Sequence, residues 1–259
     1  MSSELPPTSA RFIKLFGWYA PRFVRKHFNA VRVLGEVPDA ADPRAWLVYL
    51  NHPSWWDPMA LAVLMKHHYR ERTGYGPIDG KGLEKYRFLE KLGFFGIDPA
   101  SSEGARRFLK LGRAVLATPG QTFWVTAQGH FTDPRARPVA LRPGVAHLAR
   151  KASGAVAYPL ALEYPFWEEK QPEMLMCFGE PIALGDAATG AAQWNARLER
   201  GLEAAMDRLA AASATRDPAA FTTLLAGRRG VNPVYDLWRR GRAALRGQRF
   251  DAGHAEGGA

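Results

Sequence analysis

The chain has 259 residues, of which 47% are hydrophobic and 23% charged, which is typical of a globular protein and excludes a largely disordered one. Its 35 Lys and Arg against 25 Asp and Glu give a net charge of +10, which indicates an anionic partner such as a membrane surface, a nucleic acid or a phosphorylated substrate. No apolar run approaches the roughly 18 residues that span a bilayer, and no secretory signal is visible, so we expect no transmembrane helix.

The first patterned segment covers residues 11–34 and is rich in aromatic and basic side chains. Phe12, Phe16 and Tyr19 recur at helical spacing, with basic residues beside them. This pattern is typical of an amphipathic helix in a membrane interface, and it also fits a helix that docks on the core and leaves a basic edge in solvent. Pro21 predicts a split into two short helices, because proline removes a backbone donor.

Strand and helix patterns then alternate along the chain. Strands are predicted at residues 46–50, 93–97, 121–126, 155–163 and 174–178, and helices at 57–68, 82–92, 101–117, 144–152 and 189–212. Such alternation predicts an α/β fold with a mixed, largely parallel sheet flanked by helices, preceded by the N-terminal amphipathic helical segment.

The same patterns predict three parts. Residues 1–35 are expected to form an amphipathic membrane-interface segment, residues 36–215 the main domain, and residues 216–259 a C-terminal helical extension, with a basic helix over 234–250, and a disordered tail. Cys177 is the only cysteine and lies in a predicted buried strand, which excludes an internal disulfide and fits a reducing compartment.

The stretch NHPSWWDP places His52 and Asp57 between a predicted strand and a predicted helix. One interpretation is structural, with Asp57 capping a helix whose first turn holds Pro58, and His52 an ordinary loop residue. The other is chemical, because a histidine whose second ring nitrogen is held by a carboxylate can take a proton from a hydroxyl at neutral pH. The two are compatible, because Asp57 can begin the helix and still hold His52.

Other chemistries have weaker support in this stretch. Ser54 lies close to His52, but no G-x-S-x-G pattern surrounds it, so a serine hydrolase is not indicated. One histidine and one aspartate without further clustered ligands predict no metal site, and no cofactor is expected. The pair therefore points to a general base that activates the hydroxyl of an acceptor.

The stretch NHPSWWD resembles the NH-x4-D signature of the glycerolipid acyltransferases, the family that includes 1-acylglycerol-3-phosphate acyltransferase. Three later stretches resemble further blocks of that family in the same order, namely GFFGID (93–98), TFWVTAQGHFTD (122–133) and AVAYPLALEY (155–164). The resemblance runs from about residue 46 to 180 and implies that residues 36–215 form an acyltransferase domain. It also implies that His52 is the general base, that Asp57 orients it, and that the reaction transfers an acyl group from a thioester to a hydroxyl.

The chain departs from the family where the family's arginines are associated with the acceptor's phosphate. The family's third block reads Glu-Gly-Thr-Arg, and its second block ends in Ile-Asp-Arg. The corresponding residues here are Gln128, Gly129, His130 and Phe131, and Pro99 after Asp98. Both family arginines are therefore missing from their positions.

Other cations are available near these blocks. Arg135, Arg137 and Arg142 follow the third block, and a guanidinium suits phosphate because it donates two parallel hydrogen bonds. Another group shares one face of a predicted helix and consists of Arg106, Lys110 and Arg113. We expect the substrate to be bound by Gln128, Gly129, His130, Arg135 and Arg137.

The sequence thus predicts a peripheral, monotopic enzyme on the cytoplasmic face of an anionic membrane. It would transfer a fatty acyl group from acyl-CoA or acyl-carrier protein to a lysophospholipid or a related lipid acceptor. The missing family residues leave an alternative open, which is a catalytically silent lipid-binding member or one with a phosphate-free glycolipid or aminolipid acceptor. A nucleic-acid partner rests on charge alone and is not predicted, because no recognised motif appears.

Overall fold

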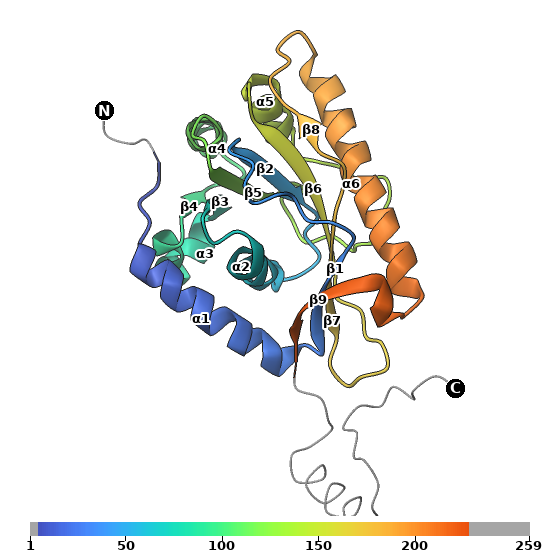
Figure 1. Cartoon of the computed structure of the whole chain (residues 1–259). Coiled ribbons are helices and arrows are strands. Elements are labelled where there is room, and N and C mark those ends of the chain that lie inside the picture. Colours follow the sequence, from blue (N-terminus) through green and yellow to red (C-terminus); the bar gives the residue numbers. More distant parts are fainter. Residues whose placement is uncertain (1–4, 228–259) are drawn as a thin grey trace, which may run out of the picture.

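The computed structural model describes residues 5–227, in which a nine-stranded sheet carries helices on both faces (Figure 1). The sheet has the order β4-β3-β5-β2-β6-β7-β1-β9, and β8 pairs with β6. Pairing is parallel from β4 through β6 and between β7 and β1, and antiparallel elsewhere. The strands are β1 (Ala30–Leu34), β2 (Trp46–Leu50), β3 (Thr73–Asp79), β4 (Phe94–Ile97), β5 (Gln121–Thr126), β6 (Val156–Glu163), β7 (Glu173–Phe178), β8 (Ile182–Ala183) and β9 (Phe221–Ala226). This confirms the predicted mixed, largely parallel sheet.

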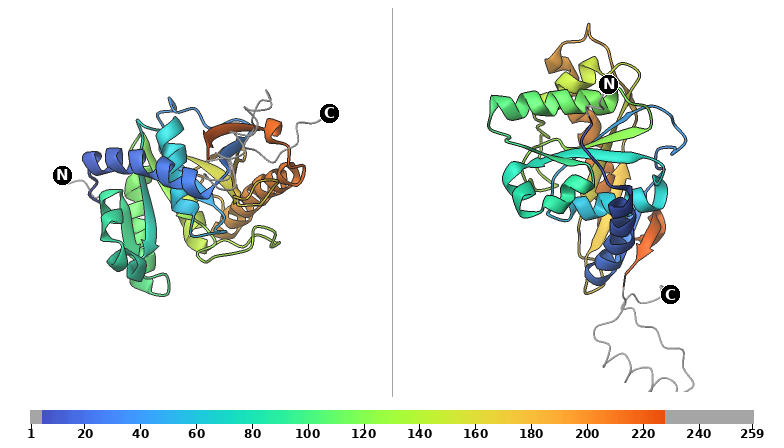
Figure 2. Two further views of the ribbon diagram at one scale, coloured as in Figure 1. Left: turned by 90° about the horizontal axis from the view of Figure 1, so that it is seen from below. Right: turned by 90° about the vertical axis from the view of Figure 1, so that its left-hand side faces the viewer.

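The helices divide between the two faces of the sheet (Figures 1 and 2). One face is covered by α1 and α2, which pack on each other, and the other by α4, α5 and α6. The helices are α1 (Ala10–His27), α2 (Asp57–His68), α3 (Gly80–Lys85), α4 (Ser102–Leu116), α5 (Pro143–Lys151) and α6 (Ala191–Ala214), with 3-10 turns η1 (Arg87–Lys91) and η2 (Pro218–Ala220).

β2 lies between β5 and β6 and is buried on both sides. Successive side chains of a strand point to opposite faces, so Leu47 and Tyr49 join the core under α4 to α6, whereas Trp46, Val48 and Leu50 join the core under α1 and α2. Burial on both faces explains the continuous apolar sequence of this strand. It also places the end of β2 in the middle of the sheet edge.

The N-terminal segment differs from the prediction in two ways. α1 is one helix that continues through Pro21, so the expected split is wrong. The helix is buried on both sides of the proline, at Ala20 and Val24, and such tertiary packing outweighs the lost backbone hydrogen bond. Residues 30–34 form β1 rather than helix, and β1 pairs with β7 and with β9.

The sheet therefore takes strands from both sides of residues 36–215, the predicted main domain, because β1 precedes this range and β9 follows it. The three-part division of the chain stays a prediction. The helix predicted over 82–92 is α3 followed by η1, and the Gly- and Pro-containing strand β3 was not predicted. The helix predicted over 234–250 lies outside the described residues.

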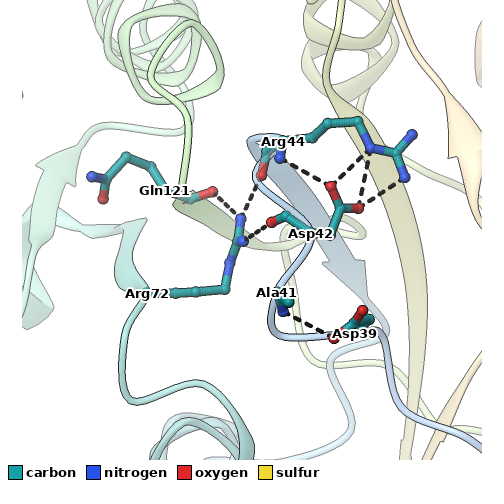
Figure 3. A network of polar contacts seen from close by, with 6 residues as sticks. All are labelled: Asp39, Ala41, Asp42, Arg44, Arg72 and Gln121. Carbon is teal, nitrogen blue, oxygen red and sulfur yellow. Dashed lines mark hydrogen bonds and ion pairs between the residues drawn. The ribbon is translucent and has the colours of Figure 1, made fainter.

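A buried arginine fixes the edge of the sheet at which β2 and β5 begin (Figure 3). The guanidinium of Arg72 stacks on the Trp46 ring at 3.6 Å from its centroid. It also donates hydrogen bonds of 2.6–3.1 Å to the backbone oxygens of Asp42, Arg44 and Gln121 and to Thr122 Oγ1. This arginine network lies at the edge opposite the carboxyl ends of the parallel strands.

Candidate active site

The loop that follows β2 is anchored to the end of β6 by a buried asparagine. Asn51 Nδ2 donates to the backbone oxygen of Leu162 over 2.9 Å, and Asn51 Oδ1 accepts from the Leu162 N–H over 2.8 Å. The side chain thus prolongs the pairing of β2 with β6 by one residue. This fixes the position of His52 at the carboxyl end of the sheet, where α/β folds bind ligands.

His52 and Asp57 meet across the loop. His52 Nδ1 lies 2.6 Å from Asp57 Oδ2, and Tyr164 Oη donates to Asp57 Oδ1 over 2.8 Å. The Asp57 side chain is 1% exposed, and that of His52 is 21% exposed. The predicted capping role of Asp57 is wrong, because Trp56 occupies the N-cap position without a side-chain hydrogen bond and both carboxylate oxygens of Asp57 serve His52 and Tyr164.

The electrostatics of this group follow from its burial. Desolvation raises the pKa of the Asp57 carboxyl, while the hydrogen bonds from His52 and Tyr164 oppose that shift. Burial and the neighbouring Asp57 raise the pKa of the Tyr164 hydroxyl well above its usual value, so Tyr164 stays a donor at neutral pH. An ionised carboxylate only accepts hydrogen bonds, so the proton of neutral His52 is on Nδ1 and Nε2 is left with a lone pair.

The loop after β5 folds over His52. The buried Gln128 accepts the His52 backbone N–H at its Oε1 over 3.0 Å, and the Thr132 N–H donates to the His52 backbone oxygen over 2.9 Å. The Phe131 ring lies against the imidazole, with 4.3 Å between centroids and a tilt of 34° between the rings, although Phe131 is 60% exposed. Gln128 therefore holds the backbone of His52, and the substrate contact expected of it stays a prediction.

Gly129 brings an arginine close to this loop. Its φ of +73° favours glycine, and an added Cβ would lie 2.7 Å from Arg142 Nε. Arg142 donates to the Pro99 backbone oxygen over 3.3 Å, so it lies between the loop after β4 and the loop after β5. Within residues 5–227, Arg142 forms no ion pair with a carboxylate.

The remaining predicted binding residues lie on the surface. Arg135 pairs with Asp133 over 2.7 Å, and Arg137 pairs with Asp207 over 2.6 Å. His130 is exposed. Among the described residues, no contact joins these three side chains to His52 or Asp57, so the structure does not bring them together with the pair.

Tyr164 and Phe131 contact the pair directly, and Asn51 anchors the loop that carries His52, yet no sequence pattern assigned these three residues a role. Asn51 and Tyr164 lie just beyond the ends of β2 and β6, which are neighbours in the sheet. A polar residue at the end of a predicted parallel strand was the available signal. The order of the strands, which decides which ends meet, could not be taken from the sequence.

The face of α1 that points to solvent carries Leu15 and Trp18, which are 58% and 55% exposed. Arg11 and Lys14 lie among them. In residues 5–227, no helix combines the length and apolar character needed to cross a bilayer. An exposed apolar face with basic neighbours on such a helix is consistent with peripheral association with a membrane.

The sheet, its flanking helices and their order form a fold that is shared with an acyltransferase of known structure. That structure is the 1-acyl-sn-glycerophosphate (LPA) acyltransferase PlsC from Thermotoga maritima, with a TM-score of 0.55 and 14% sequence identity, covering 78% of this chain and 80% of that chain. No family model and no curated protein matches the sequence. At this identity the likeness shows a common fold, so roles of individual residues have to be argued from their chemistry.

Proposed function

We propose that this protein is an acyltransferase that moves an acyl group from a thioester, acyl-CoA or acyl-carrier protein, to the hydroxyl of a lysophospholipid-like acceptor. The observation that carries the proposal is the 2.6 Å contact between His52 Nδ1 and Asp57 Oδ2 at the carboxyl end of a central strand. The likeness of the fold to an acyltransferase supports it.

His52 is the general base in this proposal. Its Nε2 takes the proton of the acceptor hydroxyl while the hydroxyl oxygen attacks the thioester carbonyl. The new C–O bond forms, the C–S bond breaks, and the imidazolium returns the proton to the leaving thiolate. Asp57 keeps the imidazole in the required tautomer and stabilises the imidazolium, and a base of this kind contributes about 10²–10⁴-fold.

The direct test is release of thiol from acyl-CoA by the purified protein in the presence of lysophosphatidic acid, with the acylated product identified by mass spectrometry. His52→Ala should lower acceptor-dependent release by at least about 100-fold. His147→Ala, which removes an exposed histidine of α5, should not. Full activity in a folded His52→Ala variant would disprove the mechanism.

For the acceptor, we propose a phosphate bound by Arg142. Its guanidinium lies at the two loops in which the family's arginines are missing, and it has no ion pair among the described residues. Arg135 and Arg137 are already engaged with carboxylates, which makes them weaker candidates.

A second candidate function is acylation of a phosphate-free acceptor, such as a glycolipid or aminolipid. Phe131 favours it, because the residue at the place of a family arginine packs against the imidazole and offers no charge. A comparison of lysophosphatidic acid with phosphate-free hydroxyl acceptors separates the two. A catalytically silent lipid-binding role has less support, because the His52–Asp57 pair is intact.

We also propose that the protein acts as a monotopic enzyme at the cytoplasmic face of an anionic membrane. The exposed apolar side chains of α1 and the net charge of +10 support this placement.

A further inference from the structure

We propose that Tyr164 is a positioning residue, which holds the Asp57 carboxylate so that its Oδ2 faces Nδ1 of His52. Tyr164 lies one residue beyond the end of β6, and its hydroxyl donates to Asp57 Oδ1 over 2.8 Å while Oδ2 contacts the imidazole. The three side chains thus form a chain of two hydrogen bonds. The kinetic part of this inference rests on the proposed function, whereas the structural part does not.

The tyrosine itself is held by a second element. Phe28 directly follows α1, is 1% exposed, and its ring centroid lies 5.8 Å from that of Tyr164. The same ring meets Trp56 edge to face at 4.8 Å, and Trp56 is the residue before Asp57. Phe28 therefore contacts both Tyr164 and Trp56, and it limits the orientations that the phenol of Tyr164 can adopt.

The Tyr164 hydroxyl affects the protonation state of Asp57 because that carboxyl group is buried. A buried carboxylate needs donors, and loss of the phenol removes the hydroxyl that donates to Oδ1, so the protonated acid would be favoured. A protonated carboxyl donates to His52 Nδ1, which moves the histidine proton to Nε2. The imidazole in that tautomer cannot accept a proton from a substrate hydroxyl at Nε2. Tyr164 thus selects the productive tautomer through Asp57.

The titratable groups that face Asp57 are His52, from the same loop, and Tyr164, from the end of β6. From α1, His27 contacts the Trp56 ring at 5.2 Å between centroids rather than the carboxylate. The acid limb of a pH–rate profile would therefore report protonation of the Asp57 carboxylate, whose hydrogen-bond partners are His52 and Tyr164.

Tyr164→Phe tests the inference, because it removes the hydroxyl and keeps the ring. We expect a fall in kcat of about 10–100-fold, as for loss of a hydrogen bond to a charged group, with little change in KM for the donor. The acid limb of the pH–rate profile should move to higher pH. In the ¹⁵N spectrum of the resting protein, the His52 proton should shift from Nδ1 towards Nε2.

The matched control is Tyr49→Phe, which removes a buried hydroxyl that donates to the Leu198 backbone oxygen over 3.1 Å. This variant should lose stability only, with kcat, pH profile and imidazole spectrum unchanged. A folded Tyr164→Phe variant with the wild-type profile and spectrum would overturn the inference. If that variant does not fold, a site-specific fluorotyrosine at position 164, a stronger donor, should move the acid limb to lower pH, and an unmoved limb would equally overturn the inference.

The spectrum also separates the two proposals. If the wild-type protein transfers no acyl group to any acceptor, the proposed function fails, yet the ¹⁵N shifts of Tyr164→Phe still decide whether the phenol sets the tautomer. If transfer is normal and the tautomer does not depend on the phenol, the positioning role fails alone.

Discussion

Asp57 is a carboxylate in surroundings that disfavour its charge. It is buried, and desolvation is the largest influence on its pKa, which lies above its ordinary value. The two hydrogen bonds it accepts offset part of this cost. A group kept ionised against its environment is common at catalytic sites, and it trades stability for reactivity.

Asp57→Asn should therefore separate stability from function. The folded chain holds this proton more tightly than the unfolded chain, so stability falls as pH rises from the ordinary aspartate pKa through the raised folded value. Above that window the charged form costs stability, and a neutral isostere avoids the cost. We expect an unchanged or higher Tm at pH 8, a flatter dependence of Tm on pH, and acyl transfer reduced by at least about 100-fold. Thermal unfolding at pH 5 and pH 8 measures this, and a lower Tm at pH 8 than wild type would contradict it.

Arg142→Ala tests the acceptor phosphate. If Arg142 binds it, KM for lysophosphatidic acid should rise by about 10–100-fold, while transfer to a phosphate-free acceptor should not change. Arg142→Lys should restore only part of the affinity, because an ammonium cannot donate a bidentate pair. Arg216→Ala, which removes an exposed arginine paired with Glu168, is the control for net charge. Equal KM values in wild type and Arg142→Ala would favour the phosphate-free acceptor.

At the level of residues, the sequence pattern predicted that His52 and Asp57 meet, because only a short turn separates them. Tyr164 and Arg142 could not be placed in the same way. Their positions depend on β6 lying beside β2 and on the loops after β4 and β5 converging, which are long-range facts. The roles of all these residues stay predictions until the variants are measured.

Among the elements, α1 links an exposed face to the loop of the candidate site. A line of aromatic contacts with centroids 5.6–6.5 Å apart runs from η1 along α1 to that loop, through Phe88, Phe12, Phe16, Tyr19, Phe23 and Trp56. Trp18 and Leu15 project to solvent from the same helix, and Arg22 stacks on Trp18 at 3.9 Å. The helix thus has one side for the protein and one side open to a lipid surface.

Leu15→Ala with Trp18→Ala should weaken binding to vesicles that contain phosphatidylglycerol, by about 10-fold or more, because both side chains would enter the interface. Wild-type binding should also weaken at high salt, because basic residues contribute. Co-sedimentation measures both. Phe166→Ala, which removes a 64% exposed aromatic from the β6–β7 loop, should bind as wild type. Unchanged binding of the double variant would exclude this face of α1 as the docking surface.

The elements that sequence patterns missed are those defined by distant partners. β1 and β9 pair although the intervening chain runs from Leu34 to Phe221. β1 also follows an amphipathic helix, and both segments mix apolar and basic residues, so the sequence pattern does not mark where the helix ends and the strand begins. By contrast, β2 and β5 were predicted at their observed residues, because short runs rich in aromatic, β-branched and aliphatic residues, with Gly or Pro nearby, indicate buried strands.

In the whole molecule, the carboxyl ends of the parallel strands and the opposite ends of those strands have different roles. The carboxyl ends carry the candidate site on loops held by single side chains such as Asn51 and Gln128. The opposite edge is tied by Arg72, whose guanidinium joins the segment before β2 to the start of β5 (Figure 3). A rigid base at one edge allows the loops of the other edge to be positioned accurately.

Arg72→Met should therefore reduce stability without changing chemistry. The variant leaves three backbone oxygens and Thr122 Oγ1 without the donor they share, and losing a buried donor of this kind costs about 3–5 kcal/mol of unfolding free energy. Arg44→Ala breaks only the exposed ion pair with Asp42 in the same network, so it should cost less than about 1 kcal/mol. Urea unfolding compares the two variants.

Because Arg72 lies at the opposite edge from His52, kcat measured well below Tm should equal that of wild type in both. A large loss of kcat in folded Arg72→Met would show that the two edges are coupled, and wild-type stability would show that the network does not support the sheet.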